Sequence, residues 1–293
     1  MERREEKGKE EKRNSFPKVE NLEELHVEYC YSLKEVFYLE EIEEEHTKLS
    51  RLRELILVGL PKMTAIWKGN LLAARLENLK MMKVKECGKL KNLFSKALAR
   101  KVHQLMHLAV MNCDTMEEII SNEQAEMEQE AVDIVVSSNM PSPMLFKNLQ
   151  KLTISQCKKM KSILALRLVR GLEQLEELVI TSCNQMEEII SKAEEEEEEN
   201  EDKNMLPRLK ILALQNLPRL CTLYKGALLL NWPSLEELQV WNCLKLKTLP
   251  LDLHGAPKLR KFKGQVEWFE NLEWKYEITK TRLQPLLTEE YVL

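Results

Sequence analysis

Two stretches of the chain repeat one cysteine, one methionine and two glutamates at the same spacing. Residues 113–121 read CDTMEEIIS and residues 183–191 read CNQMEEIIS, and an acidic tract follows each of them. A thiol held beside paired carboxylates could serve as a nucleophile or as a metal ligand, which would make the motif a duplicated site of chemistry. The other interpretation is a structural repeat, which predicts that the spacing recurs along the whole chain.

Other residues that could carry chemistry are isolated. His103 and His107 have the i, i+4 spacing of a zinc-binding helix, but the glutamate of that motif is missing. The glutamate runs lack the interleaved Asn, Gly and Asp of a calcium loop. The chain also contains no phosphate-binding loop, dinucleotide fingerprint or serine-hydrolase elbow. The sequence therefore predicts a protein that is not an enzyme and that uses no cofactor or metal.

The cysteine motif belongs to a longer pattern, L-x-x-L-x-[VI]-x-x-C-x-x-[LM]-x-x-[LIV]. Eight copies start at residues 22, 52, 79, 105, 149, 175, 209 and 235, and a degenerate ninth copy starts at Leu259. Six of the seven cysteines fill one position of the pattern, which leucine fills at Leu60 and Leu217. A buried apolar side chain explains this exchange, whereas a nucleophile or a metal ligand does not. Most intervals between the starts match the period of leucine-rich repeats.

The pattern predicts an α/β solenoid. Apolar residues alternate in the first half of each copy, as in a short strand, and then recur every three residues, which suits a turn or short helix. One copy cannot bury its apolar side alone, so eight to nine copies should form an open, curved leucine-rich-repeat stack. Its parallel sheet would be concave, with short helices or turns on the convex side. Residues 94–104 and 164–174 are predicted as two such helices.

The same pattern sets the domain boundaries. Residues 1–15 are a charged segment that we expect to be disordered, and the solenoid spans residues 16–264. Acidic insertions interrupt it at about 121–143 and 191–204. Residues 265–293 are predicted to cap the stack at its C-terminal end.

Two glutamates of the motif lie inside the pattern rather than in the acidic tracts. Glu117 and Glu187 occupy a position that holds Lys91 and Lys161 in other copies. Stacking should set these residues side by side, which predicts a ladder of alternating charge along one edge. Each exposed pair contributes only about 0.2 to 1 kcal/mol, so the ladder would affect register and solubility more than stability.

Composition and charge restrict the compartment and the partners. The chain has a formal net charge of −4, and its basic residues are scattered among glutamates, so nucleic acid is not an expected partner. No signal peptide follows the charged N-terminus, and no stretch reaches the roughly 18 apolar residues of a membrane span. The odd number of cysteines fits free thiols. We expect a cytoplasmic protein, and nuclear or peripheral membrane locations are the alternatives.

The residues resemble a known family, the leucine-rich-repeat region of plant intracellular nucleotide-binding immune receptors of the coiled-coil class. The resemblance rests on the repeat pattern, on the CxxMEEII copies followed by acidic loops, on YCYSLKEVF (29–37) and on the ending at 255–287. It implies a non-catalytic region of plant innate immunity that recognises a pathogen effector or a guarded host protein. A further implied partner is the nucleotide-binding domain of a receptor.

Some properties of that family are not implied for this chain. The sequence has no coiled-coil domain and no nucleotide-binding domain, so ATP binding and switching are not carried over. Two alternative functions stay open. The chain could be a truncated receptor acting as a decoy or adaptor, or a leucine-rich-repeat substrate adaptor or enzyme inhibitor outside immunity.

Recognition is expected on the concave face, where side chains between the buried strand residues should point. The candidate partner-binding residues are His26, Tyr29, Ile56, Val58, Lys83, Lys85, His107, Met111, Lys151, Thr153, Val179, Thr181, Ile211, Gln215, Gln239 and Trp241. Trp241 is the strongest candidate, because an exposed tryptophan on a strand face is costly without a contact. The alternative is that the C-terminal segment with Trp268, Phe269 and Trp274 covers it while closing the end of the stack.

Overall fold

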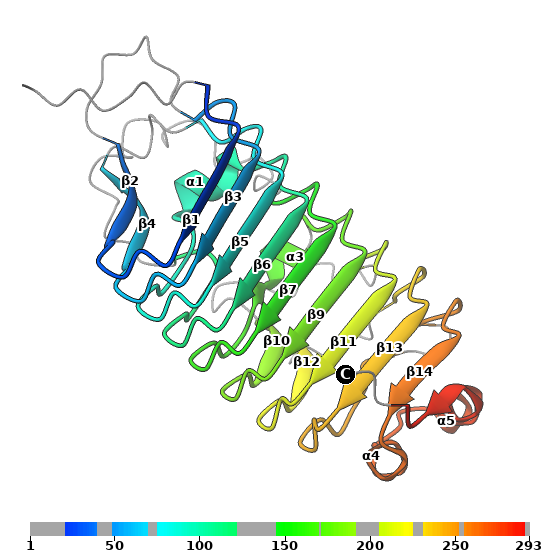
Figure 1. Cartoon of the computed structure of the whole chain (residues 1–293). Coiled ribbons are helices and arrows are strands. Elements are labelled where there is room, and N and C mark those ends of the chain that lie inside the picture. Colours follow the sequence, from blue (N-terminus) through cyan, green and yellow to red (C-terminus); the bar gives the residue numbers. More distant parts are fainter. Residues whose placement is uncertain are drawn as a thin grey trace, which may run out of the picture.

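The structure is a computed structural model, and it describes residues 21–39, 49–69, 75–121, 145–169, 171–191, 205–224, 231–251 and 255–290. In these residues the chain forms a solenoid, in which successive turns add parallel strands to one long sheet (Figure 1). The predicted parallel leucine-rich-repeat stack is therefore confirmed. Residues 1–15 and nearly all of the two predicted acidic insertions lie outside the described residues.

Each copy of the sequence pattern supplies one strand of this long sheet. In spatial order the strands are β1 (Glu24–Glu28), β3 (Glu54–Val58), β5 (Met81–Lys85), β6 (His107–Met111), β7 (Lys151–Ser155), β9 (Glu177–Thr181), β11 (Ile211–Gln215), β13 (Glu237–Trp241), β14 (Lys261–Gly264) and β15 (Leu287–Thr288). The degenerate ninth copy forms β14. Only β15 comes from outside the repeat, and it pairs with β14.

The opposite side of the solenoid is a mixture of short strands and short helices. The strands are β2 (Glu35–Leu39) paired with β4 (Ala65–Gly69), and β10 (Glu188–Ser191) paired with both β8 (Leu164–Ala165) and β12 (Thr222–Tyr224). The helices are α1 (Lys96–Lys101) and α3 (Leu166–Val169), which Figure 1 shows behind the long sheet. Both lie within the predicted helical segments but are shorter. The short strands were not predicted.

Local preference and neighbouring copies together explain the short strand β10. The EEIIS stretch at 187–191 contains two consecutive isoleucines, whose β-branched side chains favour an extended backbone. Ile190 pairs with Leu164 on one side and with Tyr224 on the other. The second MEEII copy therefore forms a strand where the sequence pattern suggested a turn, because neighbouring copies offer it hydrogen-bond partners.

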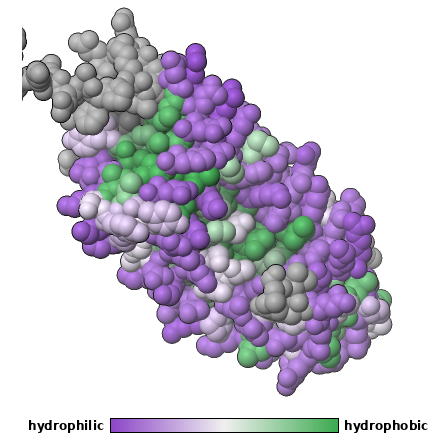
Figure 2. Space-filling view, in the orientation of Figure 1, coloured by the Kyte–Doolittle hydropathy of each residue, from purple (hydrophilic) through white to green (hydrophobic). Residues whose placement is uncertain are grey.

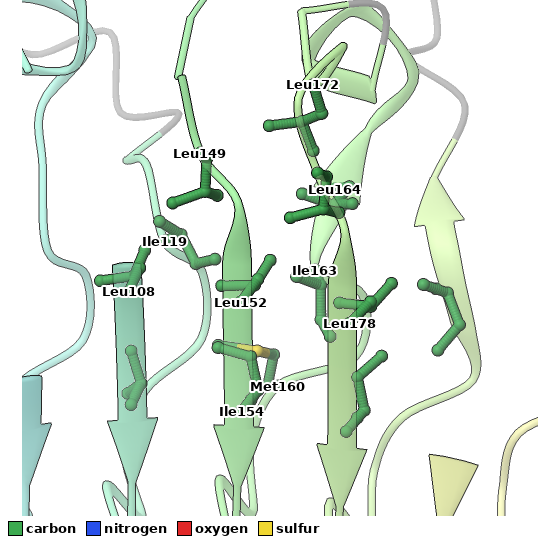
Figure 3. Close-up of a cluster of buried hydrophobic side chains, with 14 of the residues drawn as sticks. Leu108, Ile119, Leu149, Leu152, Ile154, Met160, Ile163, Leu164, Leu172 and Leu178 are labelled. Carbon is green, nitrogen blue, oxygen red and sulfur yellow. The ribbon is translucent and has the colours of Figure 1, made fainter. Parts of the chain in front are cut away.

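The core is a set of apolar columns that run through the stack. Leu108, Leu152 and Leu178 occupy the same position on β6, β7 and β9, and each is at most 2% exposed (Figure 3). The other pattern positions of the internal copies are buried in the same way. Because a column continues through all copies, each copy covers the apolar side of the next.

One further column was not recognised in the sequence. It lies three residues before the first residue of each copy, from the second copy to the ninth. Its members, all buried, are Leu49, Leu76, Val102, Phe146, Leu172, Leu206, Trp232 and Ala256. The carbonyl oxygen of each accepts a hydrogen bond of 2.9 to 3.3 Å from the backbone N–H of the starting residue. This tight turn brings the chain into the strand. Its side chains range from alanine to tryptophan, so no single residue type marks the position.

The residue at which the chain turns away from each of these strands has a left-handed backbone conformation, and these residues form a further column. The residue just before the cysteine position has φ between 52° and 65° in all eight copies from Tyr29 to Asn242. In the first seven copies its backbone N–H still donates to the next copy, at 2.8 or 2.9 Å. The chain therefore turns sharply without losing a ladder hydrogen bond. A Cβ atom on Gly59 would lie 2.6 Å from Cδ1 of Tyr29, so another residue at this position would have to displace that ring.

Aromatic side chains close the C-terminal end of the stack. After β14 the chain forms α4 (Val266–Glu270), α5 (Glu277–Leu283) and a 3-10 turn, η4 (Gln284–Leu286). The rings of Trp268 and Phe269 meet Phe262 edge-on, with centroids 6.1 and 5.6 Å away. The indole N–H of Trp268 donates to the Leu246 carbonyl at 2.9 Å. These contacts cover the apolar columns at their C-terminal ends.

Candidate functional site

The outward face of the long sheet consists of three rows of side chains. Strict parallel pairing places the first, third and fifth residues of each strand beside their counterparts on the next strand. The middle row reads His26, Ile56, Lys83, Ala109, Thr153, Val179, Ala213, Gln239 and Lys263. Every candidate residue belongs to one of these rows except Tyr29, which follows β1 in the left-handed column.

The candidate residues differ in their exposure. Most are partly or fully exposed, but Val58 and Trp241 are each only 7% exposed. Trp241 therefore does not present an open indole ring to a partner. Of the three residues named as its cover, Trp268 and Phe269 contact the ring of Phe262, and Trp274 contacts the ring of Phe269. The outward residues of β1 are exposed, and most outward residues from β3 to β11 are partly or fully exposed.

Charges on this face are paired between neighbouring strands. The carboxylate of Glu177 lies 2.9 Å from Lys151 Nζ, and that of Glu54 lies 2.9 Å from His26 Nε2. Lys85 pairs instead with the next residue along the chain, Glu86, at 3.1 Å. These pairs are partly exposed and contribute about 0 to 1 kcal/mol each, so they orient side chains more than they stabilise the fold.

At the C-terminal end of the face, Glu237 joins a denser network. Its carboxylate lies 3.0 Å from Lys263 Nζ and accepts a hydrogen bond of 2.7 Å from Gln239 Nε2. Burial raises the pKa of Glu237, but Lys263 and Gln239 outweigh burial and hold that pKa below its usual value. The carboxylate is therefore ionised at neutral pH, and the network keeps the end of the face fixed.

Between these charged positions lie uncharged side chains. Thr181 donates to the Ser155 hydroxyl at 2.8 Å, and Gln215 donates to Gln239 at 3.2 Å. Partly exposed apolar residues, including Met111, Val179 and Ile211, lie beside them. Figure 2 shows apolar side chains gathered near the middle of this face and at the end where β1 lies. The arrangement is an ordered surface of mixed polarity.

The predicted charge ladder has the expected backbone neighbours but different ion pairs. Glu117 N donates to the Lys91 carbonyl, and Glu187 N donates to the Lys161 carbonyl, both at 2.9 Å. Among the described residues, the Glu117 carboxylate forms an ion pair with Lys159, at 4.0 Å. The sequence could not predict which lysine pairs with Glu117, because a long exposed lysine can reach several carboxylates.

The pKa values in the cysteine column depend on contacts between thiols and on burial: the Cys87 thiol lowers the pKa of Cys113, and the Cys157 thiol lowers the pKa of Cys183. The Cys113 thiol and then burial raise the pKa of Cys87, and the Cys183 thiol and burial do the same for Cys157. Burial raises the pKa of Cys243 to about 12. Each of these sulfurs also lies 3.3 to 3.5 Å from the carbonyl oxygen two residues earlier, to which its S–H donates. Cysteine therefore fills the column and satisfies a carbonyl.

These properties predict which thiols react. At pH about 8, an excess of an alkylating reagent should modify the exposed Cys30 and Cys221 at least about 100-fold faster than the five buried thiols, because only a solvated thiolate attacks. Mass spectrometry of timed samples measures this. Denaturant should make all seven reactive, and Cys221→Ser should remove one fast site. Rapid modification of Cys157 in the folded protein would contradict the assignment.

The raised pKa of Cys243 also predicts how the stability of the fold changes at high pH. A thiol of ordinary pKa, about 8.5, ionises in the unfolded chain, whereas the raised pKa keeps Cys243 protonated in the folded chain. This contribution to stability is complete below about pH 8.5 and is lost as the pH rises toward about 12. Unfolding should therefore become easier across that alkaline range.

The remaining residues that could take part in catalysis or metal binding do not come together in one site. His107 begins β6, whereas His103 lies in the turn before it, so the pair is not on one helix. Among the described residues, no group of three or more His, Cys, Asp or Glu side chains is placed to hold a metal ion. None of the helices in this part of the chain has the length and apolar character needed to cross a membrane.

Comparison with known proteins gives consistent matches. The family "Plant disease resistance protein RPS2-like, leucine-rich repeats" matches residues 12–114 and 121–261. In Arabidopsis thaliana, disease resistance protein RPS5 is 31% identical over 150 residues, which cover 50% of this chain and 16% of the relative. Disease resistance protein UNI is 31% identical over 166 residues, covering 55% and 17%. The chain spans about a fifth or less of the length of the curated relatives it matches.

Proposed function

Because this chain belongs to the family of RPS2-like plant disease resistance proteins with leucine-rich repeats, we propose that it is a non-catalytic protein-recognition module of plant innate immunity. Its sheet face senses a pathogen effector or a guarded host protein. The observation that supports this function is the face itself, where nine strands place their side chains in continuous rows and most of these side chains are partly or fully exposed. In this proposal the chain acts in the cytoplasm, where its cysteines stay reduced.

The physical character of the face suits a protein partner. Met111, Val179 and Ile211 offer apolar contact area, and the Lys151–Glu177 pair offers charge for orientation. Cross-strand hydrogen bonds such as Thr181 to Ser155 hold the surface in one conformation before binding. A partner therefore meets side chains whose entropy is already reduced, which lowers the cost of association.

The test compares variants of the face with a variant elsewhere on the surface. Met111→Glu and Val179→Glu place charge among partly exposed apolar residues, whereas Leu244→Glu changes a 63% exposed residue in the turn after the cysteine position. Each protein is expressed in leaf tissue as a fusion with a proximity-labelling enzyme. The face variants should lose partners that the unchanged chain and Leu244→Glu both retain.

A folding control and a contradicting outcome complete this test. Thermal unfolding of the purified variants should match that of the unchanged chain, which shows that a lost partner is not a lost fold. If both face variants recover the same partners as Leu244→Glu, recognition does not use this face.

A further inference from the structure

Four of the five lysines on the outward face of the long sheet are paired with a carboxylate. The paired lysines are Lys85, Lys151, Lys261 and Lys263, whose Nζ atoms lie 2.9 to 3.5 Å from a glutamate oxygen. The fifth, Lys83, forms no ion pair among the described residues, which include the strands on both sides of it in full. Lys83 thus differs from the other lysines of this face in having no counter-charge.

Lys83 lies at the centre of nine outward side chains on β3, β5 and β6, which lie side by side in the sheet (Figure 1). The register places Ile56 and Ala109 beside it on the adjacent strands, and Met81 and Lys85 are its outward neighbours along β5. We call this group the Lys83 block, and its members are Glu54, Ile56, Val58, Met81, Lys83, Lys85, His107, Ala109 and Met111. Five of the nine are apolar, and all but Val58 are partly exposed. A partner that covers the block therefore meets a cation surrounded by apolar groups.

The glutamates in and beside the Lys83 block have other partners. Glu54, at one corner of the block, places its carboxylate 2.9 Å from His26 Nε2 on β1. Glu86, the residue after β5, lies 3.1 Å from Lys85. Water therefore solvates the partly exposed ammonium group of Lys83 in the free chain.

A partner that covers the Lys83 block removes this water. An ammonium group that loses its water without gaining a counter-charge costs free energy, and apolar neighbours do not reduce that cost. An apolar or basic side chain opposite Lys83 is therefore rejected, whereas a carboxylate gains a strong attraction in surroundings of low polarity. A phosphate group fits less well, because it carries about two charges and favours several donors. The other lysine of the block, Lys85, already pairs with Glu86.

We propose that Lys83 selects the partner by its charge. The protein segment that docks on this part of the face places an aspartate or glutamate against Lys83, and apolar side chains beside that residue contact Ile56 and Met111. Lys83 has this role only if the outward face is the recognition surface, so the assignment rests on the proposed function.

Short random peptides displayed on phage provide the probe. They are selected on the full chain, and those that bind equally well to the Ala109→Trp variant are discarded. This variant fills the Lys83 block with a neutral indole ring, so the peptides that remain depend on the block. They should share an aspartate or glutamate that is flanked by apolar residues.

Calorimetry with synthetic versions of these peptides tests the contact itself. Lys83→Glu should weaken binding at least about 30-fold, because it replaces an attraction by a repulsion in a covered site. A peptide whose acidic residue is replaced by lysine should bind Lys83→Glu at least about tenfold more tightly than it binds the unchanged chain.

Lys80→Glu is the matched control. It makes the same change of charge at an exposed residue just before β5, outside the outward rows, and should change the affinity less than about threefold. Thermal unfolding of both variants should match that of the unchanged chain, since neither residue is buried.

The outcomes separate this role of Lys83 from the proposed function. Block-dependent peptides without an acidic residue, or equal losses in Lys83→Glu and Lys80→Glu, overturn the role of Lys83 alone. A phosphoserine peptide that binds at least about tenfold more tightly than its aspartate version assigns the site to phosphate and also overturns it. If no block-dependent peptide is found, the result counts against Lys83 when the face variants Met111→Glu and Val179→Glu lose partners in leaf tissue, and against the proposed function when they do not.

Discussion

The Val110→Asp protein should lose more than about 4 kcal/mol of unfolding free energy, because a carboxylate would be buried in the apolar core without a partner. Val110 is 0% exposed on β6, between Val84 on β5 and Ile154 on β7. A carboxylate at this point has no cation within the column and must either stay charged in an apolar core or take up a proton. Circular dichroism during urea unfolding measures the loss.

The preceding residue gives a matched control. Ala109 is partly exposed on the outward face, between Lys83 and Thr153 in its row. Ala109→Asp introduces the same carboxylate one residue away, beside solvent and near a lysine, and should change the unfolding free energy by no more than about 0.5 kcal/mol. Equal losses in the two variants would mean that the alternation of inward and outward side chains on β6 is wrong.

The Phe262→Ala protein should lose about 3 to 5 kcal/mol, because a fully buried ring is replaced by a cavity. Phe262 contacts the rings of both Trp268 and Phe269, so its removal also separates α4 from the last repeat. In a solenoid, each repeat interacts mainly with its neighbours. The damage should therefore concentrate at the C-terminal end.

Hydrogen exchange by mass spectrometry checks both the size and the location of this effect. Peptides covering residues 261–283 should exchange much faster in Phe262→Ala, whereas peptides covering β6 and β7 should change little. Leu244→Ala, which removes a 63% exposed side chain, serves as the control and should leave both regions unchanged. Uniform acceleration along the whole sheet would show instead that the stack unfolds as a single cooperative unit.

The sequence identified the repeat because substitution within a column is chemically restricted. Cys113 and Leu217 fill equivalent positions, and each must be a buried residue that fits between two neighbouring copies. The alternation that assigned Thr153 and Val179 to one face is likewise a local property, since successive strand residues point to opposite sides. The nine strands of the repeat, their order and the membership of the face rows could therefore be predicted without coordinates.

Other features depend on contacts between residues far apart in the chain. The buried column from Leu49 to Ala256 has no common residue type, because the space at each turn depends on the preceding and following copies. The strand at Glu188–Ser191 forms because Leu164 and Tyr224 are placed beside it. Trp241 lies on the outward face as its position in the strand requires, yet it is 7% exposed. Periodicity along the chain determined which way each side chain points, and only the tertiary structure decided what lies against it.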